Sequence, residues 1–274
     1  MSLLTGVLFG AGDFIGGLAG RRVRILEVLV GAHLVGLVGI VVASLLIAET
    51  FTVRDLGWGA AGGAFGFVGL GLLYRGLTRG PMGVVAPLTA ITSAAVPALW
   101  GVVVNAEQLA LLGWLGVVLA LVAIGLVSRQ PTQGEPMSAA AVSEALLAGL
   151  GFGAMFIFLD QTDPATAPWS IVGARLLTAG VLAIVFVARR ERVFPADPVA
   201  RGLIVGLGVC DTASNALFLY AADAGSLAVA GVLSSLYPVS TVVLARVVLG
   251  ERLQRPQQVG FLLAVGGAVL IAAN

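Results

Sequence analysis

The chain contains ten apolar segments of about twenty residues each, which leave little of its 274 residues for anything else. A hydrocarbon core about 30 Å thick is crossed by a helix of about 20 residues. Five segments lie on each side of a polar stretch near the centre of the chain. We expect helices at residues 3–20, 26–48, 57–78, 81–104, 109–128, 142–160, 168–188, 201–221, 224–247 and 257–273.

Composition excludes a water-soluble globule. Hydrophobic residues make up 59% of the chain and charged residues 11%, with a mean hydropathy of +1.05, whereas a soluble domain has about 25% charged residues. The sequence therefore predicts an all-α integral membrane protein whose main partner is the lipid bilayer. The net charge of +1 gives no indication of a nucleic-acid partner.

The two sets of five segments resemble each other at an offset of 142–146 residues. The matched pairs that are not aliphatic are Phe9 with Phe152, Tyr74 with Tyr220, and Glu107 with Glu251. Chance matching between Ala- and Gly-rich helices is the alternative. A repeat with an odd number of spans is inverted in the membrane relative to its copy, a known construction for secondary transporters. We expect repeats at 1–128 and 142–274, joined by a linker at 129–141.

Arginine placement agrees with an even number of spans. Thirteen of the fifteen arginines follow odd-numbered spans, whereas only Arg54 follows an even-numbered span and Arg175 lies within one. We call these two sides of the membrane the arginine-rich and arginine-poor sides. By the positive-inside rule the arginine-rich side is cytoplasmic, which places both termini outside.

Four ionisable residues fall well inside the spans, away from their ends, where a charge costs about 2.5–3.5 kcal/mol unless it is paired or hydrated. Asp13 and Asp211 are candidates for binding a substrate ammonium group or a coupling proton, and structural pairing is the alternative. Arg175 is a candidate for binding a substrate carboxylate, although it could also snorkel or pair with an acid. His33 occupies the matching position in the first half.

Several uncharged polar residues and two prolines are further candidates. Asn215 lies one helical turn after Asp211 and adds a polar group to the same face. Proline frees a backbone carbonyl that nearby hydroxyls can satisfy, so Pro97 and Pro238 are candidate hinges. Plain kinks with self-satisfied hydroxyls are the alternative. The remaining candidate substrate-binding residues are Tyr74, Thr92, Ser93 and Tyr237.

The sequence carries no signal of catalysis or of a cofactor. It contains no His-Glu-x-x-His, Gly-x-Ser-x-Gly or phosphate-binding loop. One histidine and one cysteine leave little room for a metal site. Glu107 and Glu251 precede spans 5 and 10, where an acid favours the N-terminus of the following helix, so we expect both to be structural.

Short motifs in both halves resemble those of EamA-type permeases of the drug/metabolite transporter superfamily. These are Leu236-Tyr237-Pro238-Val239 and Leu249-Gly250-Glu251-Arg252-Leu253 in the second half, and Val85-Ala86-Pro87-Leu88 in the first. The resemblance implies two inverted five-helix repeats, a central cavity lined by spans 1–4 and 6–9, and peripheral spans 5 and 10. Arg175 matches the arginine common in the second helix of the family's repeat, whereas Asn105-Ala106-Glu107 departs from the usual Gly-Glu-Arg. Relatives usually place both termini in the cytoplasm, against the arginine count, so orientation stays open.

We therefore expect a carrier in a bacterial inner membrane that exports a small polar metabolite, an amino acid or related zwitterion, by alternating access. A multidrug exporter of lipophilic cations is the second hypothesis. A membrane scaffold or sensor without flux is the third, and it predicts a dry centre in which both acids are paired. A homodimer is compatible with the sequence.

Overall fold

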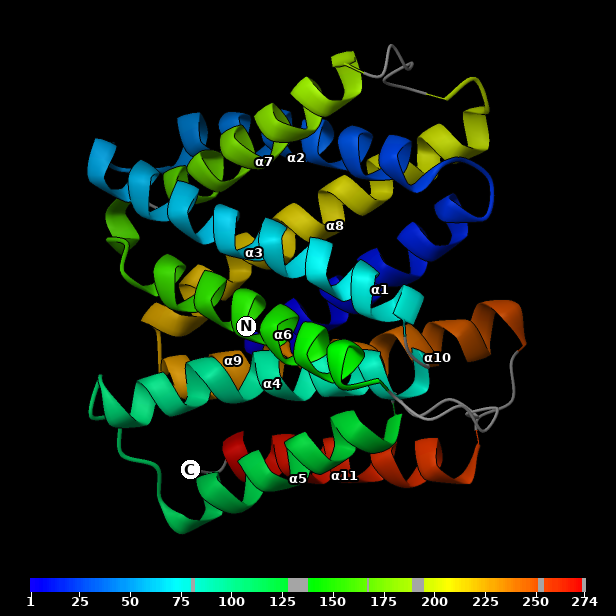
Figure 1. The fold of residues 1–274 in the computed structure, drawn as a ribbon. Helices are drawn as coiled ribbons and strands as arrows, with labels where there is room; N and C mark the ends of the chain where they lie inside the picture. The colour runs from blue at the N-terminus through cyan, green and yellow to red at the C-terminus, as the bar shows by residue number, and fades with distance from the viewer. Residues whose placement is uncertain (80–81, 128–137, 167, 189–194, 251–253, 273–274) are drawn as a thin grey trace.

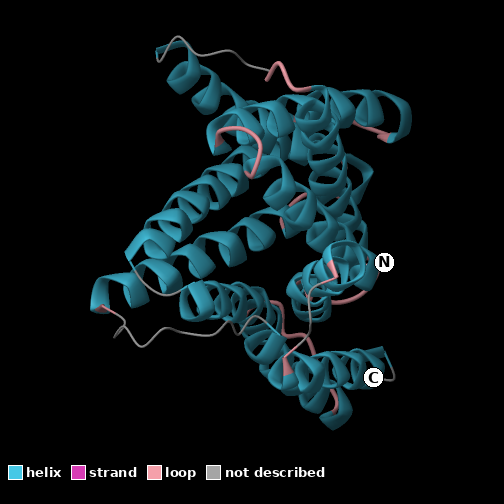
Figure 2. Ribbon diagram, turned by 90° about the vertical axis from the view of Figure 1, so that its right-hand side faces the viewer, coloured by secondary structure: helices cyan, strands magenta, loops and turns pink. Residues whose placement is uncertain are grey.

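The computed structural model describes residues 1–79, 82–127, 138–166, 168–188, 195–250 and 254–272, and these residues contain helices and loops but no strand. The α-helices are α1 (Ser2–Gly20), α2 (Ile25–Ile47), α3 (Val53–Arg79), α4 (Met82–Val103), α5 (Leu111–Val127), α6 (Ala139–Asp160), α7 (Trp169–Ala188), α8 (Pro198–Asp223), α9 (Leu227–Ser234), α10 (Tyr237–Leu249) and α11 (Arg255–Ala272). A short 3₁₀ turn, η1 (Pro164–Thr166), precedes α7. Figure 2 shows the same helical arrangement from the side.

Nine of the ten expected spans are single helices, and the ninth is broken. The sequence predicts one helix over 224–247, but α9 ends at Ser234 and α10 begins at Tyr237. Pro238 has no amide hydrogen and cannot bond to the carbonyl of Ser234, which favours a break at this point. Pro97 lies inside α4, which remains continuous.

Helix α6 begins earlier than expected. Ser138 is its N-cap and accepts a hydrogen bond from the Ala141 amide at 3.2 Å. The predicted linker at 129–141 therefore overlaps the first turn of α6 by three residues. A capping serine before an alanine-rich run is a local signal for this start.

Hydropathy and exposure both fit a lipid environment. Six helical segments are long and apolar enough to cross a membrane: Ser2–Gly20, Ile25–Ile47, Val53–Leu73, Ala139–Asp160, Pro198–Asp223 and Leu227–Leu249. Four shorter apolar helices contain the remaining expected spans. Large apolar side chains such as Leu46, Ile184 and Leu262 are at least 70% exposed. Such surfaces are costly in water and ordinary in hydrocarbon.

Helix packing exchanges partners between the two halves. At the repeat offset, α1 corresponds to α6, α2 to α7 and α3 to α8. Helix α1 packs against α8, and its counterpart α6 packs against α3. Helix α2 packs against α8, and its counterpart α7 packs against α3. Likewise α1 contacts α9 and α10 as α6 contacts α4. The counterparts α2 and α7, and α5 and α11, pack against each other. This exchange is what a two-fold relation between the halves produces.

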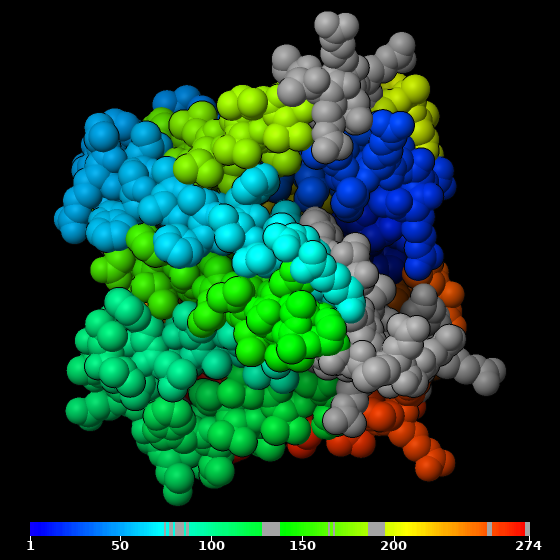
Figure 3. Space-filling model, viewed as in Figure 1, coloured from blue at the N-terminus to red at the C-terminus, as the bar shows by residue number. Residues whose placement is uncertain are grey.

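The paired helices define an interior and two edges. Helices α5 and α11 form one edge of the molecule, and α2 and α7 lie toward the other (Figure 1). Helices α3 and α6 adjoin on the face that the space-filling view presents (Figure 3). The largest buried apolar cluster joins α4, α5, α9 and α11, so the peripheral pair is anchored to the rest through α4 and α9.

Backbone geometry also agrees with the repeat. Ala106 is the only non-glycine residue with positive φ in the described part of the chain, at 55°, and Gly250 has φ 70°. The two residues are equivalent at the offset of 144 that also pairs Glu107 with Glu251. In each half, a residue with left-handed backbone follows the fourth span. Only in the first half does that residue carry a Cβ, which is unfavourable there.

A salt bridge joins the two halves on the arginine-rich side. Asp197 caps α8 by accepting a hydrogen bond from the Val199 amide at 2.9 Å, and Arg22 lies 3.3 Å from the same carboxylate. The Val199 amide is the main cause of a lowered pKa at Asp197, and Arg22 contributes. Both side chains are partly exposed, so the bridge itself adds little stability.

Gly59 tests the close packing of α3 against α7. A Cβ at Gly59 would overlap the backbone carbonyl of Ser170, whereas one at Gly57 on the same helix would meet nothing within 4 Å. We expect Gly59→Ala to lower the free energy of unfolding by about 1–3 kcal/mol through overpacking. Gly57→Ala is the control and should be neutral or slightly stabilising. Unfolding in mixed micelles measures both, and equal effects would contradict the close approach.

Ala106 and Gly250 offer a reciprocal test of the repeat. We expect Ala106→Gly to raise the free energy of unfolding by about 0.5–1 kcal/mol, because glycine relieves the left-handed strain but costs more backbone entropy. Gly250→Ala should lower it by a similar amount. The same unfolding assay measures both, and a destabilising Ala106→Gly would contradict the assigned geometry.

Candidate functional site

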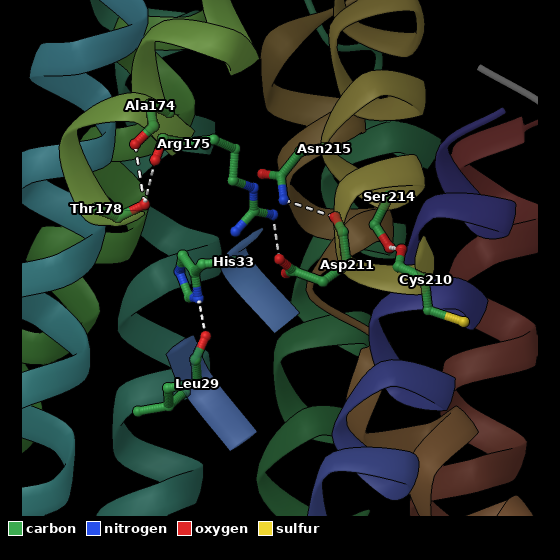
Figure 4. Close-up of polar contacts among 9 residues, drawn as sticks. All are labelled: Leu29, His33, Ala174, Arg175, Thr178, Cys210, Asp211, Ser214 and Asn215. Atoms are coloured by element: carbon green, nitrogen blue, oxygen red, sulfur yellow. Dashed lines mark hydrogen bonds and ion pairs between the residues drawn. The ribbon is translucent and has the colours of Figure 1, made fainter. Parts of the chain in front are cut away.

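An ion pair within the helical bundle joins α7 to α8. The guanidinium of Arg175 donates from Nη2 to Oδ2 of Asp211 (Figure 4). The Arg175 side chain is 8% exposed and that of Asp211 is 34% exposed. The arginine is therefore held inside the protein while one side of the aspartate stays open. Of the alternatives for Arg175, pairing with an acid is what the structure contains.

Hydrogen bonds to the backbone surround this pair. The Asn215 side-chain amide donates to the backbone carbonyl of Asp211 at 2.8 Å, and the Thr178 hydroxyl donates to that of Ala174 at 3.0 Å. Figure 4 shows Asn215 and Thr178 flanking the two charged side chains. The predicted shared face of Asp211 and Asn215 is present, and Asn215 acts on the helix backbone.

His33 lies on α2 next to the ion pair. Its Nδ1 is 2.8 Å from the Leu29 carbonyl oxygen, and because a carbonyl only accepts, Nδ1 carries the hydrogen. In the neutral ring Nε2 is then an acceptor. His33 interacts electrostatically with both Arg175 and Asp211, so the repeat-related positions 33 and 175 converge on the same aspartate.

Gly36 allows α2 to approach this close. A Cβ built there would overlap the hydroxyl of Thr212 on α8 and lie 3.5 Å from Nε of Arg175. Any side chain at this position would collide with Thr212. The sequence therefore needs glycine one turn after His33 for α2, α7 and α8 to meet.

Asp13 approaches from α1. It lies deep in the bundle and interacts electrostatically with Asp211 and Tyr237, yet its side chain keeps an exposed surface. The carboxylate is therefore not enclosed by protein on all sides. Among the described residues it forms no ion pair or hydrogen bond. The expected alternative of a pair with His33 is not what the structure contains.

We call Asp13, His33, Arg175 and Asp211 the charged cluster. With both carboxylates ionised and the imidazole neutral, its two negative charges face one positive charge. The positive charge is already paired, and one carboxylate is not. The cluster therefore has the electrostatics of a site for a cation.

The comparisons with known proteins concern the family match and the fold. Residues 140–273 match the EamA-like transporter family. The second half of the chain is therefore similar to EamA-like transporters. A solved crystal structure has the same fold, with a TM-score of 0.80 at 18% identity, covering 99% of this chain and 95% of that one. No curated protein matches the chain. The apolar helices and these two matches together indicate a multi-pass membrane protein whose second half is similar to EamA-like transporters.

Two predicted site residues form hydrogen bonds within α4 and none with the charged cluster among the described residues. The Thr92 hydroxyl donates to the Leu88 carbonyl at 2.8 Å, and the Ser93 hydroxyl to the Ala90 carbonyl at 3.1 Å. A Cβ at Gly149 would lie 2.5 Å from the Thr92 Cβ, so Thr92 belongs to the contact between α4 and α6. Both hydroxyls are self-satisfied, the alternative noted from the sequence.

The remaining candidates differ in their surroundings. Tyr237 is the first residue of α10 and interacts electrostatically with Asp13, whereas the side chain of Tyr74 lies outside the described residues. The ring of Pro97 faces Gly231, where a built Cβ would lie 2.6 Å away. Pro238 follows the break in the ninth span.

Two glutamates make contacts that the sequence did not indicate. Glu107 was expected to favour the N-terminus of α5, but its carboxylate binds the N-terminus of α9 in the other half. Glu251 lies outside the described residues. Glu144 is buried and accepts from Arg79 at 2.5 Å and from Arg75 at 3.3 Å. Both partners of Glu144 are distant in sequence, so no local pattern reveals them.

The Arg175–Asp211 pair can be tested by separating its partners. Removing one partner leaves the other charge uncompensated, so we expect Arg175→Met to lower the free energy of unfolding by about 3 kcal/mol, at the low end for buried pairs because Asp211 is partly exposed. The double variant Arg175→Met with Asp211→Leu should recover most of that loss. A double-mutant cycle in mixed micelles measures the coupling, and additive losses would contradict the pair.

Proposed function

We propose that this chain is a secondary transporter that exports a small metabolite carrying an ammonium group across a bacterial inner membrane. The observation that carries the proposal is Asp13, a carboxylate deep in the bundle, open on one side and without a counter-ion among the described residues. An uncompensated charge inside a membrane costs free energy, so an ionisable residue at such a position is a candidate for a functional role. A substrate ammonium would supply the missing positive charge.

Amino acids and related zwitterions are the leading candidates within this class. A zwitterion brings a carboxylate as well, and Arg175 is the group in the charged cluster that can bind it in a bidentate manner. Asp211 would then give up part of its contact with Arg175 and share the ammonium with Asp13. The partial exposure of Asp211 supports such an exchange.

A lipophilic cation is the second candidate substrate, because an aromatic wall adjoins Asp13. Phe9 lies one turn before Asp13 on the same face of α1, and its ring centroid is 6.2 Å from that of Phe156. A scaffold or sensor without flux requires both acids to be paired, and Asp13 lacks a partner among the described residues.

Alternating access would arise from two halves that move against each other. The exchange of packing partners supports inverted repeats at 1–128 and 142–274. The break between α9 and α10, with Pro238 beside it, and the proline at position 97 would provide hinges. Asp13 or Asp211 could also carry a coupling proton, since either would exchange a proton for a cation.

The first test is transport in proteoliposomes. Radiolabelled amino acids and tetraphenylphosphonium are offered separately, each with and without a pH gradient. We expect Asp13→Asn to reduce flux of the transported compound at least about tenfold, since loss of one charge pairing is worth more than 1.4 kcal/mol. Asp223→Asn, at the exposed end of α8, is the matched control and should retain flux. Unchanged flux in Asp13→Asn would refute the proposal.

A further inference from the structure

Glu107 bridges the two halves on the arginine-poor side. It lies in the loop between α4 and α5, and its carboxylate accepts from the Ser226 hydroxyl at 2.5 Å, the Leu227 amide at 2.8 Å and the Ala228 amide at 3.0 Å. These groups form the N-terminus of α9, whose unpaired amides attract an anion. We call this set of contacts the Glu107 cap.

Several features hold Glu107 in this position. The preceding residue, Ala106, has the left-handed backbone described above, and the Glu107 amide donates to the Gly101 carbonyl at 3.0 Å. A Cβ built at Gly101 would lie 3.0 Å from the Ala228 amide nitrogen, so α4 and α9 are in close contact here. Backbone strain of this kind persists only where the surroundings enforce it.

The helix that the Glu107 cap binds is short and separable. Helix α9 has eight residues and ends at the break before α10. Its attachment to the first half therefore depends on the Glu107 cap at one end and on the packing of α9 against α1 and α4. Releasing the cap would free α9 to move without carrying α10 as a rigid extension.

One face of α1 shows which side of the bundle is closed. Gly6, Asp13 and Gly17 share this face at helical spacing. A Cβ at Gly6, toward the arginine-poor side, would lie 2.9 Å from the Leu233 carbonyl oxygen. A Cβ at Gly17, toward the arginine-rich side, would meet nothing within 4 Å. This face of α1 is thus closely packed on the α9–α10 segment between Asp13 and the arginine-poor side, and it is unpacked at Gly17 in the other direction.

We propose that the Glu107 cap is the contact that holds the arginine-poor entrance closed, and that its release lets the charged cluster open to that side. Glu107 is a positioning residue, because it acts through α9 and touches no group of the charged cluster in this structure. The inference rests on the proposed alternating access. An ordinary structural cap would instead stabilise α9 equally in every state.

The chain carries its own reporter for this test. Cys210 is the only cysteine in the sequence; it precedes Asp211 on α8, and the residue is partly exposed. A membrane-impermeant maleimide sulfonate is added to vesicles of either orientation, and the labelling rate is divided by that of permeant N-ethylmaleimide. For the unmodified protein we expect labelling from the arginine-rich side to be faster.

Glu107→Gln is the decisive variant. The amide keeps the shape of the side chain but has one acceptor oxygen where the carboxylate uses two. We expect labelling of Cys210 from the arginine-poor side to rise about tenfold, the equilibrium effect of losing a charge-assisted hydrogen bond. Ser226→Ala should give a smaller rise in the same direction. Glu49→Gln, an exposed acid on the same side, should leave the sided ratio unchanged.

Three results would overturn the inference: an unchanged sided ratio in both cap variants, an equal rise in Glu49→Gln, or no labelling of Cys210 from either side. Should Glu107→Gln fail to fold, Ser226→Ala alone decides. The labelling needs no substrate, so it is independent of the flux assay. If the cap variants leave the sided labelling ratio of Cys210 unchanged while transport is normal, the cap proposal is refuted. If the cap variants raise labelling from the arginine-poor side but no compound is transported, the proposed function is refuted.

Discussion

The pairing of Arg175 with Asp211 is the constraint on which the rest of the structure depends. An arginine inside the bilayer is stable only with a counter-charge, and the two residues lie on different helices, α7 and α8. Those helices must therefore stay in contact at one depth, and α2 must come close enough to enclose the pair, which Gly36 permits. Asp13 is then the acid left over, and under the proposed function it makes the pair part of a binding site.

The charge is confined to one side of the two-fold relation. At the repeat offsets, Asp13 corresponds to Phe156 and Asp211 to Phe65, so the pair α1–α8 carries acids where the pair α6–α3 carries aromatic rings. Phe65 stacks on Phe158 at 5.0 Å and Phe156 lies 4.3 Å from Phe218. The acids thus lie on α1 and α8, whereas the equivalent positions on α6 and α3 carry aromatic rings, of which Phe65 packs within the α3–α6 pair and Phe156 packs against Phe218 of α8.

Most of the fold could be predicted from the sequence, because each span has to satisfy the bilayer by itself. Hydropathy places all ten spans, and the rarity of intramembrane charge identifies the four members of the charged cluster. The break in the ninth span could not be predicted, since Pro97 and Pro238 look alike in sequence and only one interrupts its helix. The contact of the Glu107 carboxylate with the N-terminus of α9, about 120 residues away in the sequence, could not be predicted either, because it depends on how the halves pack. Thr92 and Ser93 show the same limit, because a hydroxyl in a sequence does not reveal which neighbour it faces.

A single rigid element joins the charged cluster to the Glu107 cap. Helix α8 runs unbroken from Asp211 to Asp223, a distance of about 18 Å at 1.5 Å per residue, and Ser226 follows three residues later. A ligand that draws Asp211 toward Asp13 would tilt α8 against α1, and the far end of α8 would displace the N-terminus of α9. The capping contacts are directional and span 2.5 to 3.0 Å, so a displacement of about 1 Å weakens them steeply. Neutralising the charged cluster and opening the arginine-poor side would then be two consequences of one movement.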